Sequence, residues 1–306
     1  MKEKKLLLII IFNLIIIFAE IFFGLISNSF ALIADALHNT GDVIAIVITY
    51  IALKLGSRKT TFKYTFGFMR AEMMAAFVNT LFLSITMFYM IYEAIDRFLN
   101  PEIIEPLYMI VVGIIAVIAN GISAYLLANM GEHHHHHDHS HHHHEDDANI
   151  KSAYLHMLSD ALISVGVVLA GIFIYYFKIY HIDSVLTIIF SIYILKHSYP
   201  LLKKSFLSLM DVNITEIEAD TLDSIIKDDK RICEYHDLHI YNPNSKYKFI
   251  SFHIVLDDEN ISLSDIEDIN EKIKKNLESV SFNHILIQAD TKRYIKNHTN
   301  CTIGMH

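Results

Sequence analysis

Long apolar stretches separated by short polar connections occupy the first two thirds of the chain. Crossing a bilayer as a helix takes about 20 mostly apolar residues, and six stretches reach that length. They cover roughly residues 5–27, 30–54, 73–97, 108–130, 150–177 and 182–201. The pattern predicts six membrane-spanning helices within a transmembrane domain at residues 1–210.

The pattern changes at residue 211, where charged and apolar residues alternate at short range. Residues 214–229 and 262–280 have helical spacing, whereas 232–242, 247–256 and 282–290 alternate in the manner of strands. The order αββαβ predicts a small ferredoxin-like α/β domain at residues 211–306, with helices on one face of a sheet.

Composition supports a membrane protein and excludes other classes. The 306 residues are 53% hydrophobic and 19% charged, with a mean hydropathy of +0.34, too apolar for an ordinary soluble protein. A net charge of −9 leaves no basic excess for nucleic acid. Two cysteines, Cys233 and Cys301, give no disulfide framework.

Charges in the connections predict the orientation. The starting segment MKEKK, the connection KLGSRKTTFKYTFGFMR and the pair Lys203 and Lys204 are basic, whereas NPEIIEP is acidic. Basic connections stay on the cytoplasmic side. We therefore expect an integral protein of the plasma membrane with both termini in the cytoplasm. The histidine-rich segment EHHHHHDHSHHHHEDD, residues 132–147, forms a loop on the same side.

Two of the apolar stretches carry ionisable side chains at the same spacing. The second contains His38 and Asp42, and the fifth contains His156 and Asp160. Such groups cost about 2.5–3.5 kcal/mol at a bilayer centre on insertion scales, so they commonly mark a function. A four-residue spacing places both members of a pair on one helix face, about 6 Å apart along it. Because the two helices run in opposite directions, His38 is expected level with Asp160, and Asp42 with His156.

Four such side chains form the ligand set of a tetrahedral zinc site. Asp35 could accept a hydrogen bond from the second ring nitrogen of His38, or it could join helices instead. A single histidine in this position would often be a structural hydrogen bonder, but the repeated spacing favours metal. Four further polar residues lie in these stretches, of which the asparagines are expected to serve packing and the glutamate could be a second proton site. They are Asn13, Glu20, Asn79 and Asn120.

The chain resembles the cation diffusion facilitator family of zinc exporters over nearly its whole length. The motifs are SNSFALIADALHNTGD, FGFMRAE, YEAIDRF, the histidine-rich loop, HMLSD, DLHIY, SFHIVL and HILIQAD. The resemblance implies a homodimer with a cytoplasmic αββαβ domain. It also implies one transport site per subunit, which maps onto the four residues already selected by spacing.

This chain has only some of the ligands that form further metal sites in other family members. Where some members carry histidines in the second connection, this chain has Tyr64 and Phe68, so that site is expected to be absent. Positions that hold cytoplasmic zinc in some members correspond to His236, His253 and Asp290, with Gln288 in place of a further histidine. His239 and His284 are expected to be ordinary core or surface residues.

The histidine-rich loop is expected to bind zinc weakly and to release it quickly, beside the cytoplasmic entry. A passive polar loop is the alternative. Its ten histidines are His133, His134, His135, His136, His137, His139, His141, His142, His143 and His144. The end of the chain adds a weak chelating set, His298, Cys301 and His306, or else an ordinary tail.

These observations predict a secondary transporter that exports zinc from the cytoplasm, with cobalt or cadmium as possible further substrates. The zinc ion is the transported substrate, and no organic cofactor is expected. No phosphate-binding motif of the form G-x-x-x-x-G-K-[ST] occurs, so protons are the expected counter-ion. The alternatives are a membrane-anchored zinc-buffering or sensing protein and an intramembrane zinc metalloenzyme.

Overall fold

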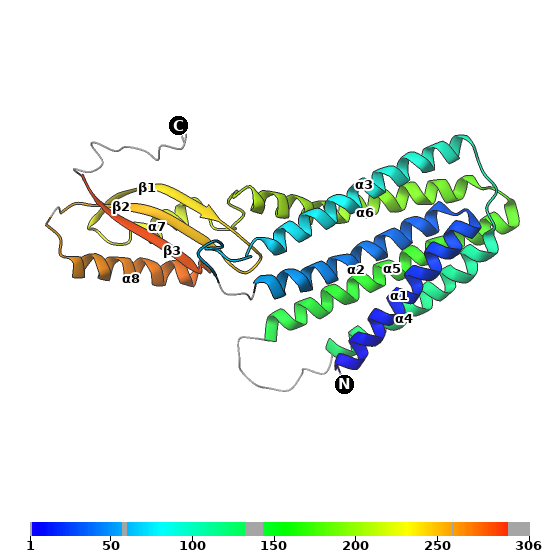
Figure 1. The fold of residues 1–306 in the computed structure, drawn as a ribbon, viewed down its shortest axis with the longest axis horizontal. Coiled ribbons are helices and arrows are strands. Elements are labelled where there is room, and N and C mark those ends of the chain that lie inside the picture. The colour runs from blue at the N-terminus through cyan, green and yellow to red at the C-terminus, as the bar shows by residue number, and fades with distance from the viewer. Residues whose placement is uncertain (1, 57–59, 132–142, 259, 293–306) are drawn as a thin grey trace. The chain divides into compact units, whose positions relative to one another are not determined.

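The computed structural model describes residues 2–56, 60–131, 143–258 and 260–292. The chain divides into two units, Met1–Val47 with Asn79–Pro200, and Ile48–Val78 with Leu201–His306. The first unit holds most of the long helices, and the second contains the sheet (Figure 1).

Long helices account for the described chain up to residue 209. They are α1 (Lys2–Ser27), α2 (Phe30–Gly56), α3 (Ala71–Leu99), α4 (Pro106–Gly131), α5 (His143–Phe177) and α6 (His181–Leu209). Within the described residues, four segments are long and apolar enough to cross a membrane: Ala71–Leu99, Pro106–Tyr125, Met157–Phe177 and His181–Leu209. A shorter apolar segment covers Asn13–Ser27.

Two helices extend beyond their apolar stretches, so the predicted boundaries there were wrong. Helix α5 begins at His143, which places residues 143–147 of the predicted loop in the helix. Helix α6 continues through Pro200 to Leu209, since Lys203 and Lys204 end the apolar stretch without ending the helix.

The starts of α2 and α6 are joined by one buried carboxylate. Asp183 of α6 accepts hydrogen bonds from the Ser29 hydroxyl at 2.6 Å and from the backbone N–H groups of Phe30 and Ala31 at 2.8 and 3.3 Å. These N–H groups belong to the first turn of α2, where backbone N–H groups have no acceptor within the helix. The bonds place Asp183 and Phe30 at the same depth in the first unit.

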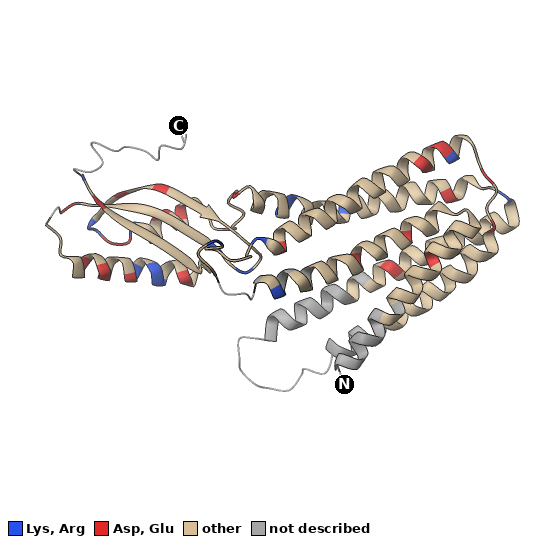
Figure 2. Cartoon of the chain, viewed as in Figure 1, with Lys and Arg blue, Asp and Glu red and all other residues tan. Residues whose placement is uncertain are grey.

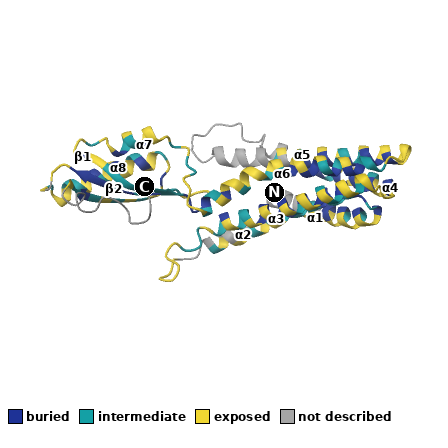
Figure 3. Cartoon of the chain, turned by 90° about the horizontal axis from the view of Figure 1, so that it is seen from above, coloured by how far each residue is buried: buried dark blue, intermediate teal, exposed yellow. Residues whose placement is uncertain are grey.

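Helices α4 and α5 approach closely at glycines. A Cβ atom on Gly113 of α4 would lie 2.7 Å from Cγ2 of Val168, and one on Gly171 of α5 would lie 2.9 Å from Cγ1 of Ile110. Small residues of this kind allow membrane helices to pack backbone against backbone. Figure 3 shows buried and exposed residues alternating along the helices, and many large apolar side chains face outward, as expected in lipid.

The second unit contains a small mixed sheet with two short helices. The elements follow the order α7 (Ala219–Ile226), β1 (Ile232–Tyr241), β2 (Phe249–Leu256), α8 (Leu263–Ser279) and β3 (His284–Thr291). Strand β2 is central, antiparallel to β1 and parallel to β3. Apolar residues of β2 and α8, among them Phe252, Ile254, Ile269 and Ile273, form the core. Charged residues are frequent on the sheet domain and sparse along the apolar helices (Figure 2).

Candidate metal centres

The first candidate centre lies where α2 meets α5. Nε2 of His38 is 3.6 Å from Oδ2 of Asp42 on its own helix and 3.7 Å from Oδ1 of Asp160 on α5. His38 and Asp160 are buried, with 6% and 1% of their surfaces exposed. One imidazole and two carboxylates, from two helices, therefore converge inside the apolar unit.

Helix geometry gives the depth of the backbone of His156, the fourth predicted ligand. The Ser164 hydroxyl of α5 donates to Oδ2 of Asp35 at 3.3 Å, which sets these two residues at the same depth. At 1.5 Å per residue, Asp42 then lies about 10.5 Å beyond Asp35, and His156 lies about 12 Å beyond Ser164. The backbone of His156 is thus level with Asp42, while its side chain lies outside the described residues.

Further polar groups are buried among the long helices. Asp35 is 1% exposed and Glu20 of α1 is fully buried. Oε2 of Glu20 accepts a hydrogen bond from Nδ2 of Asn39 at 3.1 Å, and Ser164 also donates to the backbone carbonyl of Asp160 at 3.0 Å. Asn79 and Asn120 are buried as well. The side chains of Asn39 and Ser164 were not singled out from the sequence, because a polar residue beside a motif carries no periodic signal.

A cavity of about 280 Å³ opens beside the centre. It is lined by His38 and Asp160, by Leu155 and Ser159 of α5, and by Tyr193, Ile194 and His197 of α6. His197 could not be singled out from the sequence, since a lone histidine on α6 has no repeated spacing. Helix α6 therefore contributes an imidazole to the surroundings of a centre formed by α2 and α5.

The second candidate centre lies on the sheet. His236 of β1 pairs with His253 of β2, and Asp290 lies on the neighbouring β3. Oδ2 of Asp290 is 2.8 Å from Nδ1 of His253 and 3.4 Å from Nε2 of His236. One ligand atom from each residue lies within 4.8 Å of the others. Gln288 donates from Nε2 to Oδ1 of Asp290 at 3.0 Å, so it supports the carboxylate.

Asp237 also reaches this centre, which the sequence did not indicate. Consecutive strand residues normally point to opposite faces, but β1 has a register irregularity between His236 and His239. Asp237 has a left-handed backbone there, with φ of 54°. Its Oδ2 lies 3.6 Å from Nε2 of His253, and its Oδ1 lies 3.2 Å from Nε2 of His239.

The other predicted histidines have different positions. His284 is exposed, and its ring contacts Phe249 with centroids 4.6 Å apart. The side chains of the ten loop histidines lie outside the described residues, as do His298, Cys301 and His306.

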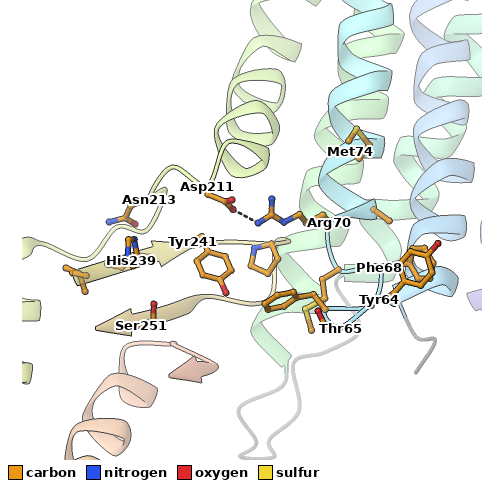
Figure 4. A pocket seen from close by; sticks show the side chains of 17 residues that line it. Tyr64, Thr65, Phe68, Arg70, Met74, Asp211, Asn213, His239, Tyr241 and Ser251 are labelled. Atoms are coloured by element: carbon orange, nitrogen blue, oxygen red, sulfur yellow. Dashed lines mark hydrogen bonds and ion pairs between the residues drawn. The ribbon is translucent and has the colours of Figure 1, made fainter. Parts of the chain in front are cut away.

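A larger cavity of about 1100 Å³ lies within the second unit. Figure 4 shows aromatic residues of the connection before α3, Tyr64 and Phe68 among them, together with residues of β1 and β2. Nη2 of Arg70 donates to Oδ1 of Asp211 at 2.5 Å. Burial, together with the nearby Asp211 carboxylate, raises the pKa of Tyr241. The rings of Tyr64 and Phe68 contact each other with centroids 5.0 Å apart.

Comparisons with known proteins match two family models to successive parts of this chain. Residues 6–210 match the family model described as the cation efflux transmembrane domain. Residues 214–292 match the model described as the cation efflux protein, cytoplasmic domain. Both matches follow the change in pattern near residue 211.

Several curated relatives align over most of the chain. The cadmium, cobalt and zinc/H(+)-K(+) antiporter of Bacillus subtilis is 34% identical over 280 residues, covering 92% of this chain and 86% of the relative. The zinc transporter ZitB of Pectobacterium atrosepticum is 31% identical, covering 80% and 73%. The metal cation efflux system protein CzcD of Cupriavidus metallidurans is 32% identical, covering 78% and 72%.

The family models cover almost all of the described chain, and the first of these relatives shares a third of its residues. The chain therefore belongs to the cation efflux family, the cation diffusion facilitators, and is a membrane transporter of metal cations rather than an enzyme.

Proposed function

We propose that this protein exports zinc from the cytoplasm in exchange for protons, at a site formed by His38, Asp42, His156 and Asp160. The observation that carries the proposal is the approach of His38 to the carboxylates of Asp42 and Asp160, at 3.6 and 3.7 Å. Burial of the Asp160 carboxylate beside the buried His38 imidazole, with the half-buried Asp42 next to them, is costly unless a cation or proton joins them. Asp35, buried between the helices, supports the geometry of the ligand set.

The ligand types support zinc as substrate. Two imidazoles and two carboxylates suit tetrahedral zinc and also cobalt, whereas copper(I) would favour sulfur ligands. The relatives' names include zinc, cadmium and cobalt. We infer that zinc is the main substrate and that cobalt and cadmium compete for the same site.

Proton exchange follows from the chemistry of the ligands. An imidazole must lose its proton before it can bind zinc, so metal and proton compete for His38 and His156. When the site faces outward, a more acidic external medium protonates the imidazoles and helps to release zinc. The protonated site then returns to face the cytoplasm. The name of the Bacillus subtilis relative contains an exchange of metal for H(+) and K(+).

We also propose how the chain is organised in the membrane. Residues 1–210 form a transport domain with six spans in the plasma membrane, and residues 211–306 form a cytoplasmic αββαβ domain of ferredoxin-like type. The basic connections support cytoplasmic termini. The match to a family model for the cytoplasmic domain supports a homodimer held through this domain.

The sheet holds a second, cytoplasmic metal site made by His236, His253 and Asp290. The support is the mutual approach of their ligand atoms to within 4.8 Å. A cytoplasmic site of this kind would report metal concentration to the dimer. The histidine-rich loop collects zinc near the entry.

Reconstitution into proteoliposomes tests the transport proposal. Zinc supplied outside vesicles with an acidic interior should enter faster as the proton gradient grows, and protons should leave. His38→Ala should abolish uptake, while Asp96→Asn, an exposed carboxylate on α3, should not. Zinc flux that ignores the pH gradient at zero membrane potential would contradict the exchange. Full flux in His38→Ala would contradict the site. Parallel runs with cobalt and cadmium would rank the metals.

A further inference from the structure

His197 lines the cavity beside the first centre without belonging to the proposed ligand set. The cavity is lined by His38 and Asp160, and His197 is the further imidazole among its lining residues. His197 itself is exposed, whereas His38 is 6% exposed. A metal entering the cavity would therefore meet an accessible nitrogen ligand as well as a buried one.

Helix geometry gives the depth of His197. Phe30 and Asp183 share one depth because they are hydrogen bonded. His38 lies eight residues along α2 from Phe30, about 12 Å, and His197 lies fourteen residues along α6 from Asp183, about 21 Å. His197 is thus about 9 Å further toward the C-terminal end of α6, the end from which the chain continues to the sheet.

The rest of the cavity lining agrees with this direction. Leu155 lies nine residues along α5 from Ser164, about 13.5 Å beyond the depth of Asp35, whereas His38 lies about 4.5 Å beyond it. Leu155 and His197 therefore share a depth. The cavity extends from the buried ligands toward the C-terminal ends of α2 and α6 and the N-terminal part of α5.

The neighbour of His197 holds its ring in a defined plane. Tyr193, one turn earlier on α6, stacks on the imidazole with centroids 6.2 Å apart and an interplanar angle of 11°. Stacking restricts the ring without occupying its nitrogens. A neutral imidazole nitrogen is a good ligand for zinc and cobalt.

We propose that His197 is an entry ligand, which binds the metal in the cavity and passes it to His38 and Asp160. This inference rests on the proposed function, because it assumes that the buried centre is the transport site. A single exposed imidazole holds a hydrated divalent cation weakly, so the metal is released readily to the buried ligands. The residue raises the occupancy of the cavity and leaves the buried site unchanged.

The alternative is that His197 serves only as a stacking partner for Tyr193. Two substitutions separate the roles. His197→Phe keeps an aromatic ring on Tyr193 but removes the metal ligand, whereas His197→Cys keeps a ligand and loses the aromatic ring. His181→Ala is the matched control, since His181 lies on the same helix and contacts Phe98 instead.

Initial rates of zinc transport from the cytoplasmic face are the first measurement. His197→Phe should raise the apparent KM by about tenfold, the lower end of the range for lost supporting contacts at metal sites, with little change in the maximal rate. His197→Cys should retain most of the affinity, and His181→Ala should resemble the parent. An unchanged KM in His197→Phe would overturn the proposal, as would a loss of affinity in His197→Cys equal to that in His197→Phe.

Metal protection gives a readout independent of flux. In a background with Cys233→Ser and Cys301→Ser, the thiol introduced by His197→Cys should react with a soluble maleimide, and zinc should slow the reaction. Modification that zinc does not slow would overturn the proposal. If His38→Ala transports zinc normally, the proposed function fails. If His38→Ala loses transport while the His197 variants transport zinc as the parent does, only the proposal for His197 fails.

Discussion

At the scale of single residues, one imidazole joins two helices. His38 lies between a carboxylate one turn along its own helix and another on α5. The two contacts are at nearly equal distance, and both exceed the length of a hydrogen bond. The three groups are therefore close enough to share one cation.

Replacing Asp160 by asparagine tests the charge separately from the shape. Asp160→Asn keeps nearly the same volume at a residue that is 1% exposed, so the protein should fold. Zinc transport should fall by at least about tenfold, because an amide is a far weaker ligand than a carboxylate. Flux and thermal unfolding should be measured together. Normal unfolding with normal flux would remove Asp160 from the site.

A second prediction concerns pH and the sheet domain. Arg231 donates from Nε and Nη2 to the two carboxylate oxygens of Asp229 at 2.9 and 2.8 Å. These hydrogen bonds lower the pKa of Asp229 to about 2, against an ordinary value of 3.8. A lowered pKa in the folded state stabilises the fold above the ordinary value, and the stabilisation is lost as the pH falls through about 2.

Asp229→Asn should therefore lower the unfolding temperature of the domain at pH 6 and have a decreasing effect as the pH falls from 4 to 2. Circular dichroism of the detergent-solubilised protein would follow the transition. Glu216→Gln, at an exposed position, is the control. A difference between Asp229→Asn and the parent that stays constant down to pH 2 would contradict the assignment of the ion pair.

Spacing alone selected His38 and Asp160, since both lie at repeated positions in apolar stretches. It could not select Asp237 or His197. Asp237 reaches its neighbours through a left-handed residue at a strand irregularity, which no alternation rule contains. His197 matters only because α6 lies beside α2 and α5, and that neighbourhood is a property of the folded bundle.

At the scale of elements, hydrophobic periodicity predicted where helices and strands lie but not all of their ends. Strands β1 and β2 fall within the alternating segments, and β3 extends one residue beyond its segment, to Thr291. Helix ends depend on local features other than apolar spacing, and both α5 and α6 continue beyond their apolar stretches. The order of strands in the sheet, with β2 central, could not be predicted because it depends on contacts between distant segments.

The close approach of α4 and α5 predicts opposite outcomes for two glycines on one helix. Gly113→Ala places a methyl group 2.7 Å from Val168, whose branched side chain is stiff, so the unfolding temperature should fall. Gly121→Ala has no neighbour within 4 Å of the new atom and should be neutral or slightly stabilising, because alanine favours a helix by up to about 1 kcal/mol over glycine. Equal unfolding temperatures for the two variants would contradict the packing.

At the scale of the whole molecule, the sheet domain has its own core and its own family match. Removing it should therefore leave the helices able to insert. A chain ending at Met210 should form fewer dimers and transport zinc more slowly, because a domain of this size can hold an interface. Crosslinking in membranes would measure the dimer. A shortened chain that crosslinks as well as the parent would place the main interface among the helices.

The cavity beside His38 also has a kinetic consequence. A site reached from the α6 C-terminal side must close that route before it opens another, so the protein should behave as a carrier and not as a channel. Its rate should saturate with zinc, and unlabelled zinc placed on the far side should speed the exit of labelled zinc by counterflow. Saturation arises because each subunit has a finite number of sites, and counterflow arises because a carrier loaded with zinc can reorient without waiting for a proton. A rate that rises in proportion to zinc, with no counterflow, would mean that the two faces of the membrane are connected at the same moment.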